Sequence, residues 1–355
     1  MTAEQQYVSL YTDLLRTIRE LGLLRRRPGY YYTRIGVVLG ALLGIVAGMI
    51  LLGNSWHQLW LAGALALVLV QVAFLSHDSA HRQIFHSNAH NDLTARILAG
   101  GVLGMSVSWW RNKHNRHHGA PNQVDKDPDV QLDAVAFTPD AVAKRGPFGR
   151  WVAARQGWLF FPLLTLEGIG LHASSLRHLL RRDASRSDRI EAAVVVARIT
   201  TYVAALYLLL PPGKASAFLG LQLAVFGVFL GAAFAPNHKG MPLVPAGMKL
   251  DFLRRQVLTS RNIRGGLFTD LAMGGLNYQI EHHLFPSMPR PTLRKVRPIV
   301  REYCELHGIA YAEVGLFTSY RIVIDYLNNV GLQARDPFDC PLAAELRSAG
   351  ARNLV

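Results

Sequence analysis

The chain has 355 residues, half of them hydrophobic, and its positive mean hydropathy is more typical of a membrane protein than of a soluble domain. The formal net charge is +14, but the basic residues form no single stripe with interleaved aromatic residues, so we expect no nucleic-acid partner. Anionic membrane lipids are the expected counter-charge. The two cysteines, Cys304 and Cys340, lack CxxC spacing, which argues against a disulfide framework and fits a reducing cytoplasm.

The N-terminal region, residues 1–33, contains acidic residues and no early apolar run, so it does not predict a signal peptide. Within it, Tyr7–Leu24 has apolar residues at helical spacing. This pattern predicts an amphipathic helix that lies on the membrane surface.

Long apolar segments predict the membrane-spanning helices, because a bilayer core of about 30 Å requires roughly 20 apolar helical residues. The four segments that qualify are Ile35–Gly53, Leu59–Ser76, Ala192–Leu210 and Ala217–Ala235. Only the third contains a charge, Arg198, whose guanidinium we expect to snorkel toward the interface or to pair inside the bundle. The short connections Asn54–Gln58 and Pro211–Ser216 group the spans into two hairpins.

The distribution of Lys and Arg predicts the orientation. Only Lys214 lies in the short connections between paired spans, and positive residues stay on the cytoplasmic side. We therefore expect an all-α, multi-pass integral membrane protein whose termini and active site are cytoplasmic. Its predicted segments are 1–33 (amphipathic), 34–76 (first transmembrane hairpin), 77–191 (cytosolic), 192–236 (second transmembrane hairpin) and 237–355 (cytosolic cap).

Two shorter apolar stretches, Ile97–Trp110 and Trp158–Leu171, have fourteen residues each and are too short to span a bilayer comfortably. They predict interfacial or re-entrant helices. Trp109 and Trp110 could line an acyl channel or serve as ordinary interfacial tryptophans.

Histidines gather at the predicted exits from the membrane and in the cytosolic segments. The motifs HDSAH, HNRHH and QIEHH place side chains three or four residues apart, on one face of a helix. A further histidine follows the fourth span by three residues, in FAPNHKG. The eight candidate metal ligands are His77, His81, His114, His117, His118, His238, His282 and His283.

Neutral imidazole suits Fe, Zn, Cu and Ni. Eight imidazoles are about twice what one tetrahedral zinc needs, so two metal ions are favoured. Because every motif lies in a predicted cytosolic segment, all of them can converge in one layer beneath the bilayer. A nitrogen-rich dinuclear iron site that activates O2 is the sharpest interpretation, although the sequence alone does not decide iron over zinc. The competing interpretation of a single histidine pair is a surface or capping role.

Other polar residues near the motifs have two interpretations. Gln279, Asn122 and Asp125 are candidates for orienting the imidazoles from outside the ligand set, as metal-bound histidines usually need. The alternative for the run Asn122–Asp129 is turn formation and capping. For Glu281 the same two roles, orienting an imidazole or capping, remain open. We expect structural or surface roles for the remaining histidines, His57, His86, His90, His172, His178 and His307.

The three motifs in this order, with two-span hairpins between them, resemble the membrane-bound fatty acid desaturase family from about residue 30 to residue 310. The glutamine of QIEHH is similar to that of the linoleoyl-type and front-end subgroup. The resemblance implies a four-helix transmembrane stem and a cytosolic cap with two irons. It also implies O2-dependent insertion of a double bond into a lipid-linked or CoA-linked fatty acyl chain. The implied iron ligands are the histidines of the three motifs, and His238 matches an additional family histidine.

Many front-end members carry a fused cytochrome b5 domain marked by HPGG, which does not occur here. We therefore expect a separate electron donor, of ferredoxin or cytochrome b5 type with its reductase. One alternative is a hydroxylase of the same histidine-box group, acting on alkanes, sterols or carotenoids. The other is a transporter or metal carrier, which would need histidines within the spans or on both sides of the membrane, and the predicted spans contain none.

Overall fold

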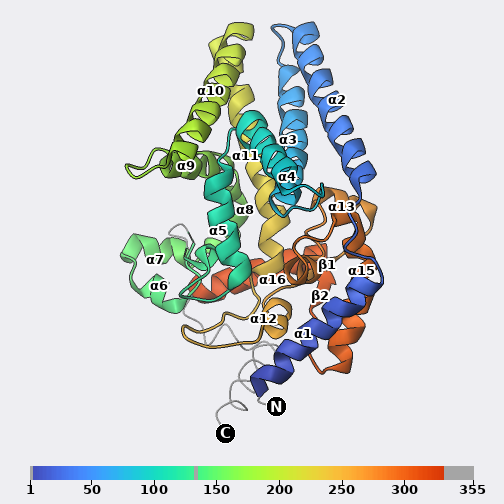
Figure 1. Cartoon of the computed structure of the whole chain (residues 1–355). Coiled ribbons are helices and arrows are strands. Elements are labelled where there is room, and N and C mark those ends of the chain that lie inside the picture. Colours follow the sequence, from blue (N-terminus) through green and yellow to red (C-terminus); the bar gives the residue numbers. More distant parts are fainter. Residues whose placement is uncertain (1–2, 132–134, 332–355) are drawn as a thin grey trace. The chain divides into compact units, whose positions relative to one another are not determined.

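The computed structural model describes residues 3–131 and 135–331, with side chains from Leu10 onward; Cys340 lies outside this range. The chain is mostly helical, as expected, and its order is visible in Figure 1. Its elements are α1 (Ala3–Glu20), α2 (Pro28–Leu52), α3 (Gln58–Ala80), α4 (Asn88–Arg96), the π-helix η1 (Ile97–Leu103), α5 (Val107–Gly119), the 3-10 helix η2 (Pro128–Val130), α6 (Pro139–Ala143), α7 (Pro147–Ala153), α8 (Gln156–Leu164), α9 (Glu167–Leu179), α10 (Arg186–Leu209), α11 (Pro212–His238), α12 (Phe252–Leu258), β1 (Asn262–Arg264), α13 (Leu267–Ala272), α14 (Gln279–Leu284), α15 (Arg290–Leu306), β2 (Glu313–Gly315) and α16 (Leu316–Gly331).

The chain divides into two compact units. We call Arg26–Asn112 with Phe161–Ala232 the membrane unit, because it contains nearly all of the long apolar helices. We call Met1–Arg25, Lys113–Phe160 and Ala233–Val355 the histidine unit. The division falls within α5, α8 and α11, so the last residues of α5 and α11 belong to the histidine unit.

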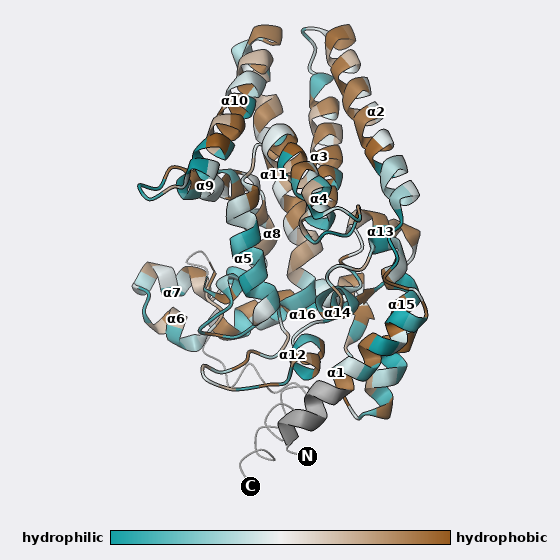
Figure 2. Ribbon diagram, in the orientation of Figure 1, coloured by the Kyte–Doolittle hydropathy of each residue, from teal (hydrophilic) through white to brown (hydrophobic). Residues whose placement is uncertain are grey.

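In the part of the chain that the structure describes, four helices, α2, α3, α10 and α11, are long and apolar enough to cross a bilayer, which confirms the four predicted spans. They are the mainly brown helices of Figure 2. Large apolar side chains on α2 point outward, with Leu43 71 % and Leu51 86 % exposed. Such a surface suits lipid rather than water.

The helices extend beyond the predicted apolar segments. α10 begins at a capping box in which Ser185 and Asp188 satisfy each other's backbone N–H groups, so polar residues form its first turn. α11 continues unbroken to His238, which is therefore the last helical residue and not part of a following loop. α3 likewise includes His77, and His81 is its C-cap.

Neither of the two shorter apolar stretches is one helix. Ile97–Trp110 breaks at Gly104, which has a positive φ of 79° and separates η1 from α5. Trp158–Leu171 breaks between α8 and α9, whose axes differ by 73°. The bent pair α8–α9 is compatible with one broken span or with a re-entrant loop, and the second of these agrees with the expected re-entrant helix.

Glycine allows the start of α9 to approach α11 at backbone distance. A Cβ on Gly168 would lie 2.5 Å from the carbonyl oxygen of Leu223, and a Cβ on Gly227 would collide with the backbone of Leu164 and Gly168. Small residues that permit such close approach are typical of helix contacts in membranes.

Replacing Gly227 by alanine is expected to lower the free energy of unfolding by about 1–3 kcal/mol, because the added carbon has no space and the neighbouring atoms are backbone. Thermal unfolding in detergent measures this. Gly220→Ala is the matched control on α11, where no atom lies within 4 Å of the new carbon, and it should leave stability unchanged or slightly higher. Equal melting of the two variants would contradict the close-approach argument.

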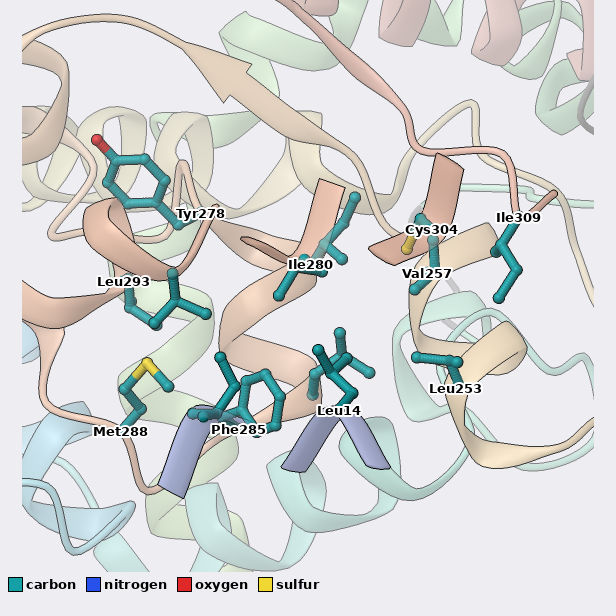
Figure 3. Close-up of a cluster of buried hydrophobic side chains, with 14 of the residues drawn as sticks. Leu14, Leu253, Val257, Tyr278, Ile280, Phe285, Met288, Leu293, Cys304 and Ile309 are labelled. Carbon is teal, nitrogen blue, oxygen red and sulfur yellow. The ribbon is translucent and has the colours of Figure 1, made fainter. Parts of the chain in front are cut away.

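The core of the histidine unit joins the N-terminal helix to the tail of the chain. Leu14 and Ile18 of α1 are fully buried with Leu253 and Val257 of α12 and with apolar residues of α14 and α15 (Figure 3). Tyr303 also donates a hydrogen bond to the carbonyl of Leu10, at 2.7 Å. The expectation that Tyr7–Leu24 lies on the membrane surface was therefore wrong for its buried face, which is covered by protein.

The described residues also contain two short β-strands. β1 and β2 pair in parallel, with Ile263 opposite Val314, and form a two-stranded sheet of three residues per strand. This sheet holds Asn262 next to α14, where it anchors the third histidine motif as described below.

Candidate metal centre

The second histidine motif lies in the last turns of α5. Ser106 immediately precedes this helix, and its side-chain oxygen accepts a hydrogen bond from the N–H of Trp109 at 3.1 Å. His114 and His118 are one turn apart on the same face, and their Nε2 atoms are 3.0 Å from each other. His117 and His118 are adjacent, so α5 presents three imidazoles to one region of the histidine unit.

The third motif and the end of α11 supply further imidazoles to the same region. The ring of His283 stacks on that of His118, with centroids 4.1 Å apart, and the ring of His282 is 4.8 Å from that of His118. His238, the last residue of α11, places its Nε2 3.3 Å from Nε2 of His117. Within the histidine unit the structure thus brings together six of the eight candidate ligands.

Three of these histidines share one arrangement of their ring nitrogens. Nδ1 of His117 faces the Asp127 carboxylate at 2.9 Å, and Nδ1 of His238 faces the carbonyl oxygen of Thr259 at 2.9 Å. Nδ1 of His283 faces the side-chain oxygen of Gln256, also at 2.9 Å. These oxygens only accept, so each Nδ1 carries the proton and each Nε2 keeps a lone pair.

The same three histidines are able to hold a metal ion. One ring nitrogen from each of His117, His238 and His283 lies within 4.8 Å of the others, and all three side chains are buried. Neutral imidazoles with outward Nδ1–H groups are the form in which histidine binds metals. The donor set therefore fits a metal that accepts nitrogen ligands.

Asp127 is the buried acid that orients His117. Its carboxylate also accepts hydrogen bonds from the N–H groups of Asn122, at 2.7 Å, and Asp129, at 2.9 Å. Burial alone would lower the pKa of His117, but the carboxylates of Asp127 and Asp129 outweigh it and raise this pKa.

The two other polar residues proposed from this loop have different surroundings. Asn122, in a left-handed conformation with φ 56°, donates from its side chain to the carbonyls of His238 and Pro242, at 3.1 and 3.2 Å. It therefore links the Asp127 loop to the end of α11. Asp125 is exposed, and the structure corrects its expected role, because Asp127 makes the contact with the histidine.

Gln279 lies inside the cluster, as its position in QIEHH suggested. Its side-chain nitrogen is 2.9 Å from Nε2 of His238, and its side-chain oxygen accepts a hydrogen bond from Asn237 at 3.2 Å. The Gln279 side chain is buried, so only a metal ion or ligand bound inside the histidine cluster could contact it.

Glu281 is buried between neutral donors. Tyr311 donates to one carboxylate oxygen and Asn262 to the other, both at 2.7 Å. Burial raises the pKa of Glu281 to about 7, although these two hydrogen bonds oppose the shift. Asn262 also accepts from the N–H of Ile280 at 2.9 Å, so the contacts of Glu281 fix the start of the short helix α14.

Tyr311→Phe is expected to lower the free energy of unfolding by about 1–3 kcal/mol, because it leaves one oxygen of a fully buried carboxyl group without its donor. Thermal unfolding of the full chain in detergent measures the effect. Tyr32→Phe, which removes an exposed hydroxyl, is the control and should change little. A Tyr311→Phe protein as stable as the control would show that Tyr311 does not anchor α14.

The first motif lies in the membrane unit. His77 is in the last turn of α3 and His81 caps it, with ring centroids 4.6 Å apart. The ring of Trp110 is 5.4 Å from that of His77 and 6.1 Å from that of His81. Trp110 therefore packs against the first motif.

The other histidines are dispersed. His86, His90 and His307 are exposed, and His57 is the residue before α3. His172 faces the carbonyls of Gly168 and Leu103 in the membrane unit, and His178 lies in the last turn of α9.

Sequence reasoning missed two contacts of the cluster. Gln256 accepts from His283 and also donates to the carbonyl of His118, at 3.0 Å, and the carbonyl of Thr259 accepts from His238. Both lie on or next to α12, far from any histidine motif in the chain. A glutamine in DFLRRQVL gives no sequence signal of such a role.

Four candidate spans and a buried imidazole cluster able to hold metal define a multi-pass membrane protein with a metal-type site. The family model for fatty acid desaturases matches residues 54–315. The chain belongs to this family, and its enzyme class is that of the fatty acid desaturases, which confirms the resemblance seen in the motifs.

Similar proteins come from a moss, a flowering plant and a nematode. An acyl-lipid (9-3)-desaturase of Physcomitrium patens is 33 % identical over 77 % of this chain. The match covers 53 % of the moss protein, so the chain spans about half of that relative. Delta(8)-fatty-acid desaturase 1 of Arabidopsis thaliana is 27 % identical, over 92 % of this chain and 75 % of its own length. A Delta(5) fatty acid desaturase of Caenorhabditis elegans is 29 % identical, over 90 % of this chain and 73 % of its own length.

Proposed function

We propose that this chain introduces a double bond into a fatty acyl chain, with O2 as co-substrate and electrons from a separate donor of ferredoxin or cytochrome b5 type. The observation that carries the proposal is the arrangement of His117, His238 and His283, whose Nδ1 atoms each face an acceptor while one ring nitrogen of each lies within 4.8 Å of the others. Family membership supports the choice of reaction.

Two iron ions are the proposed cofactor. The proposed ligands are the six histidines of the cluster in the histidine unit together with His77 and His81, the pair that the family resemblance adds. When bound, the iron pair would supply the O2-dependent oxidation that removes one hydrogen from each of two adjacent methylenes. Imidazole nitrogen suits iron, and zinc is the competing ion that metal analysis distinguishes.

The residues around the cluster hold the imidazoles in the state that binds metal. Asp127, Gln256 and the carbonyl of Thr259 keep the Nδ1 protons on the outer side of the rings. Burial of His117, His282 and His283 keeps bulk water away from the site. The protein thus supplies a fixed ligand geometry and a dry environment, while the position of the acyl chain selects which methylenes react.

The names of the relatives support a substrate class. The moss protein is named as an acyl-lipid desaturase, and the plant and nematode proteins are named as Delta(8) and Delta(5) fatty acid desaturases. We propose that this chain acts on a long-chain acyl group carried by a lipid, with acyl-CoA as the second carrier to be tested. The basic residues outside the spans would attract the phosphates of either carrier.

Product analysis tests the proposed reaction. The chain is expressed in a host with a supplied electron-donor system, and its total acyl chains are compared by mass spectrometry with double-bond localisation. We expect a new O2-dependent species that is lighter by two hydrogens and absent with an empty vector. A species heavier by one oxygen atom would instead establish the hydroxylase alternative.

We also propose that both termini and the histidine motifs are cytoplasmic, with the turn Asn54–Gln58 on the opposite side. The asymmetry of Lys and Arg between the short connections and the other segments supports this orientation. A topology reporter inserted at Ser55 should report the non-cytoplasmic side, and a cytoplasmic signal there would overturn the orientation.

A further inference from the structure

A cavity of about 190 Å³ lies inside the membrane unit, between side chains of α3, α9, α10 and α11. Most of its wall is apolar, including Leu69, Leu219 and Phe226. A cavity of about 150 Å³ with apolar walls admits a molecule of the size of benzene. This cavity therefore has room for a short stretch of one acyl chain, and it is too small for a two-chain lipid.

One cation lines this apolar space. Arg198 lies twelve residues after the start of α10, about 18 Å along the helix at 1.5 Å per residue. Its Nε donates to the carbonyl of Val102 at 2.7 Å, and its guanidinium carbon lies 4.7 Å from the ring centre of Tyr202. The sequence predicted that Arg198 either snorkels toward the interface or pairs inside the bundle. The structure shows the second, with a backbone carbonyl as the partner.

No acidic side chain pairs with Arg198 among the described side chains, those of residues 10–131 and 135–330. An arginine within a membrane-spanning helix is costly unless its charge is compensated, and such residues mark functional sites. Guanidinium has five N–H donors, of which the Val102 carbonyl takes only the one on Nε. The two terminal nitrogens remain for a ligand in the cavity.

The neighbouring polar groups add donors to the same wall. Gln222 is only 3 % exposed, and its side-chain oxygen accepts from the Tyr202 hydroxyl at 3.3 Å, which leaves its amide N–H groups for another acceptor. Both ring nitrogens of His172 lie at hydrogen-bond distance from backbone carbonyls, those of Gly168 and Leu103, so this ring is directed at the backbone. The wall therefore suits a ligand that brings acceptor oxygens and negative charge.

We infer that this cavity binds a free fatty acid, with its carboxylate at Arg198 and Gln222 and its first methylenes against Leu69, Leu219 and Phe226. A carboxylate presents two oxygens in one plane, which matches the fork of a guanidinium. The cavity wall contains none of the eight candidate metal ligands, so the bound fatty acid is an accessory ligand and not the reacting chain. The site joins η1, through Val102, to α10 and α11, so its occupation stabilises the membrane unit.

Saturable binding of radiolabelled palmitic acid to the full chain in phosphatidylcholine nanodiscs tests this site. We expect Arg198→Met, which keeps side-chain length but removes the charge, to weaken binding by roughly 10- to 100-fold. Val203→Trp, which fills the cavity without altering Arg198, should abolish binding. Arg189→Met, an exposed arginine on the same helix, is the matched control and should bind as the unaltered chain does.

Two further comparisons identify the ligand and the site. Hexadecanol, which lacks the negative charge, should compete poorly with palmitic acid, and His282→Ala should retain palmitic acid binding even where the proposed desaturation is lost. Unchanged binding in both Arg198→Met and Val203→Trp would overturn the site. Displacement by phosphatidic acid at lower concentration than by palmitic acid itself would overturn the free fatty acid as its occupant.

Discussion

His282→Ala is expected to abolish desaturation and to lower the amount of bound metal, while the protein stays folded in the membrane. His282 is buried, and its ring lies 4.8 Å from that of His118 and 6.4 Å from that of His114. Removing a ligand should weaken metal binding by more than the roughly 10–100-fold that loss of an outer contact costs. Elemental analysis of the purified chain and acyl-chain analysis measure the two effects.

Two histidines outside the cluster provide matched controls for this substitution. His307 is exposed in the histidine unit and His86 is exposed in the membrane unit. His307→Ala and His86→Ala should keep metal content and most of the activity. Complete loss of activity in His86→Ala would show that the metal has ligands beyond the eight proposed histidines. Full activity in His282→Ala would reject the proposed site.

The spacing of the histidines was sufficient to predict much of the cluster. Helical periodicity alone places His114 and His118 on one face, and the structure finds their Nε2 atoms 3.0 Å apart. The meeting of His118 with His283 needs a long-range contact that no spacing encodes, and only the shared predicted side of the membrane made it plausible. The structure shows this contact within the histidine unit, where the two rings stack with centroids 4.1 Å apart.

The contacts that orient the rings were harder to predict. Three acids follow Asn122 in the run PNQVDKDPDV, and local sequence does not show which of them turns inward. The left-handed conformation of Asn122 and the fold of the loop bring Asp127 to His117 and leave Asp125 exposed. Gln256 is beyond prediction for a different reason, since its partner His283 lies 27 residues away on another helix.

The apolar pattern predicted the four spans, but it did not predict whether lipid or protein covers each apolar face. The pattern in Tyr7–Leu24 reports an apolar face, and it does not say whether lipid or protein covers that face. The structure buries Leu14 and Ile18 in the core of the histidine unit. Similarly, Gly104 interrupts an apolar run that hydropathy alone treats as continuous, because glycine permits the positive φ of the break.

Asp127→Asn is expected to weaken metal binding by about 10–100-fold and to lower activity in parallel. The carboxylate accepts from Nδ1 of His117 and from two backbone N–H groups at once. An amide of the same shape has only one acceptor oxygen, and its NH2 group facing Nδ1 favours the tautomer in which Nε2 carries the proton. A protonated Nε2 has no lone pair for a metal, so the loss arises although the residue keeps its size.

Asp125→Asn is the control, because it makes the same chemical change two residues away on an exposed side chain. Chelator competition gives the metal affinity of both variants, and thermal unfolding shows whether the loop remains folded. Loss of affinity in Asp127→Asn with a retained melting temperature would assign the effect to ring orientation. Equal affinities of the two variants would show that the tautomer of His117 is set by another group.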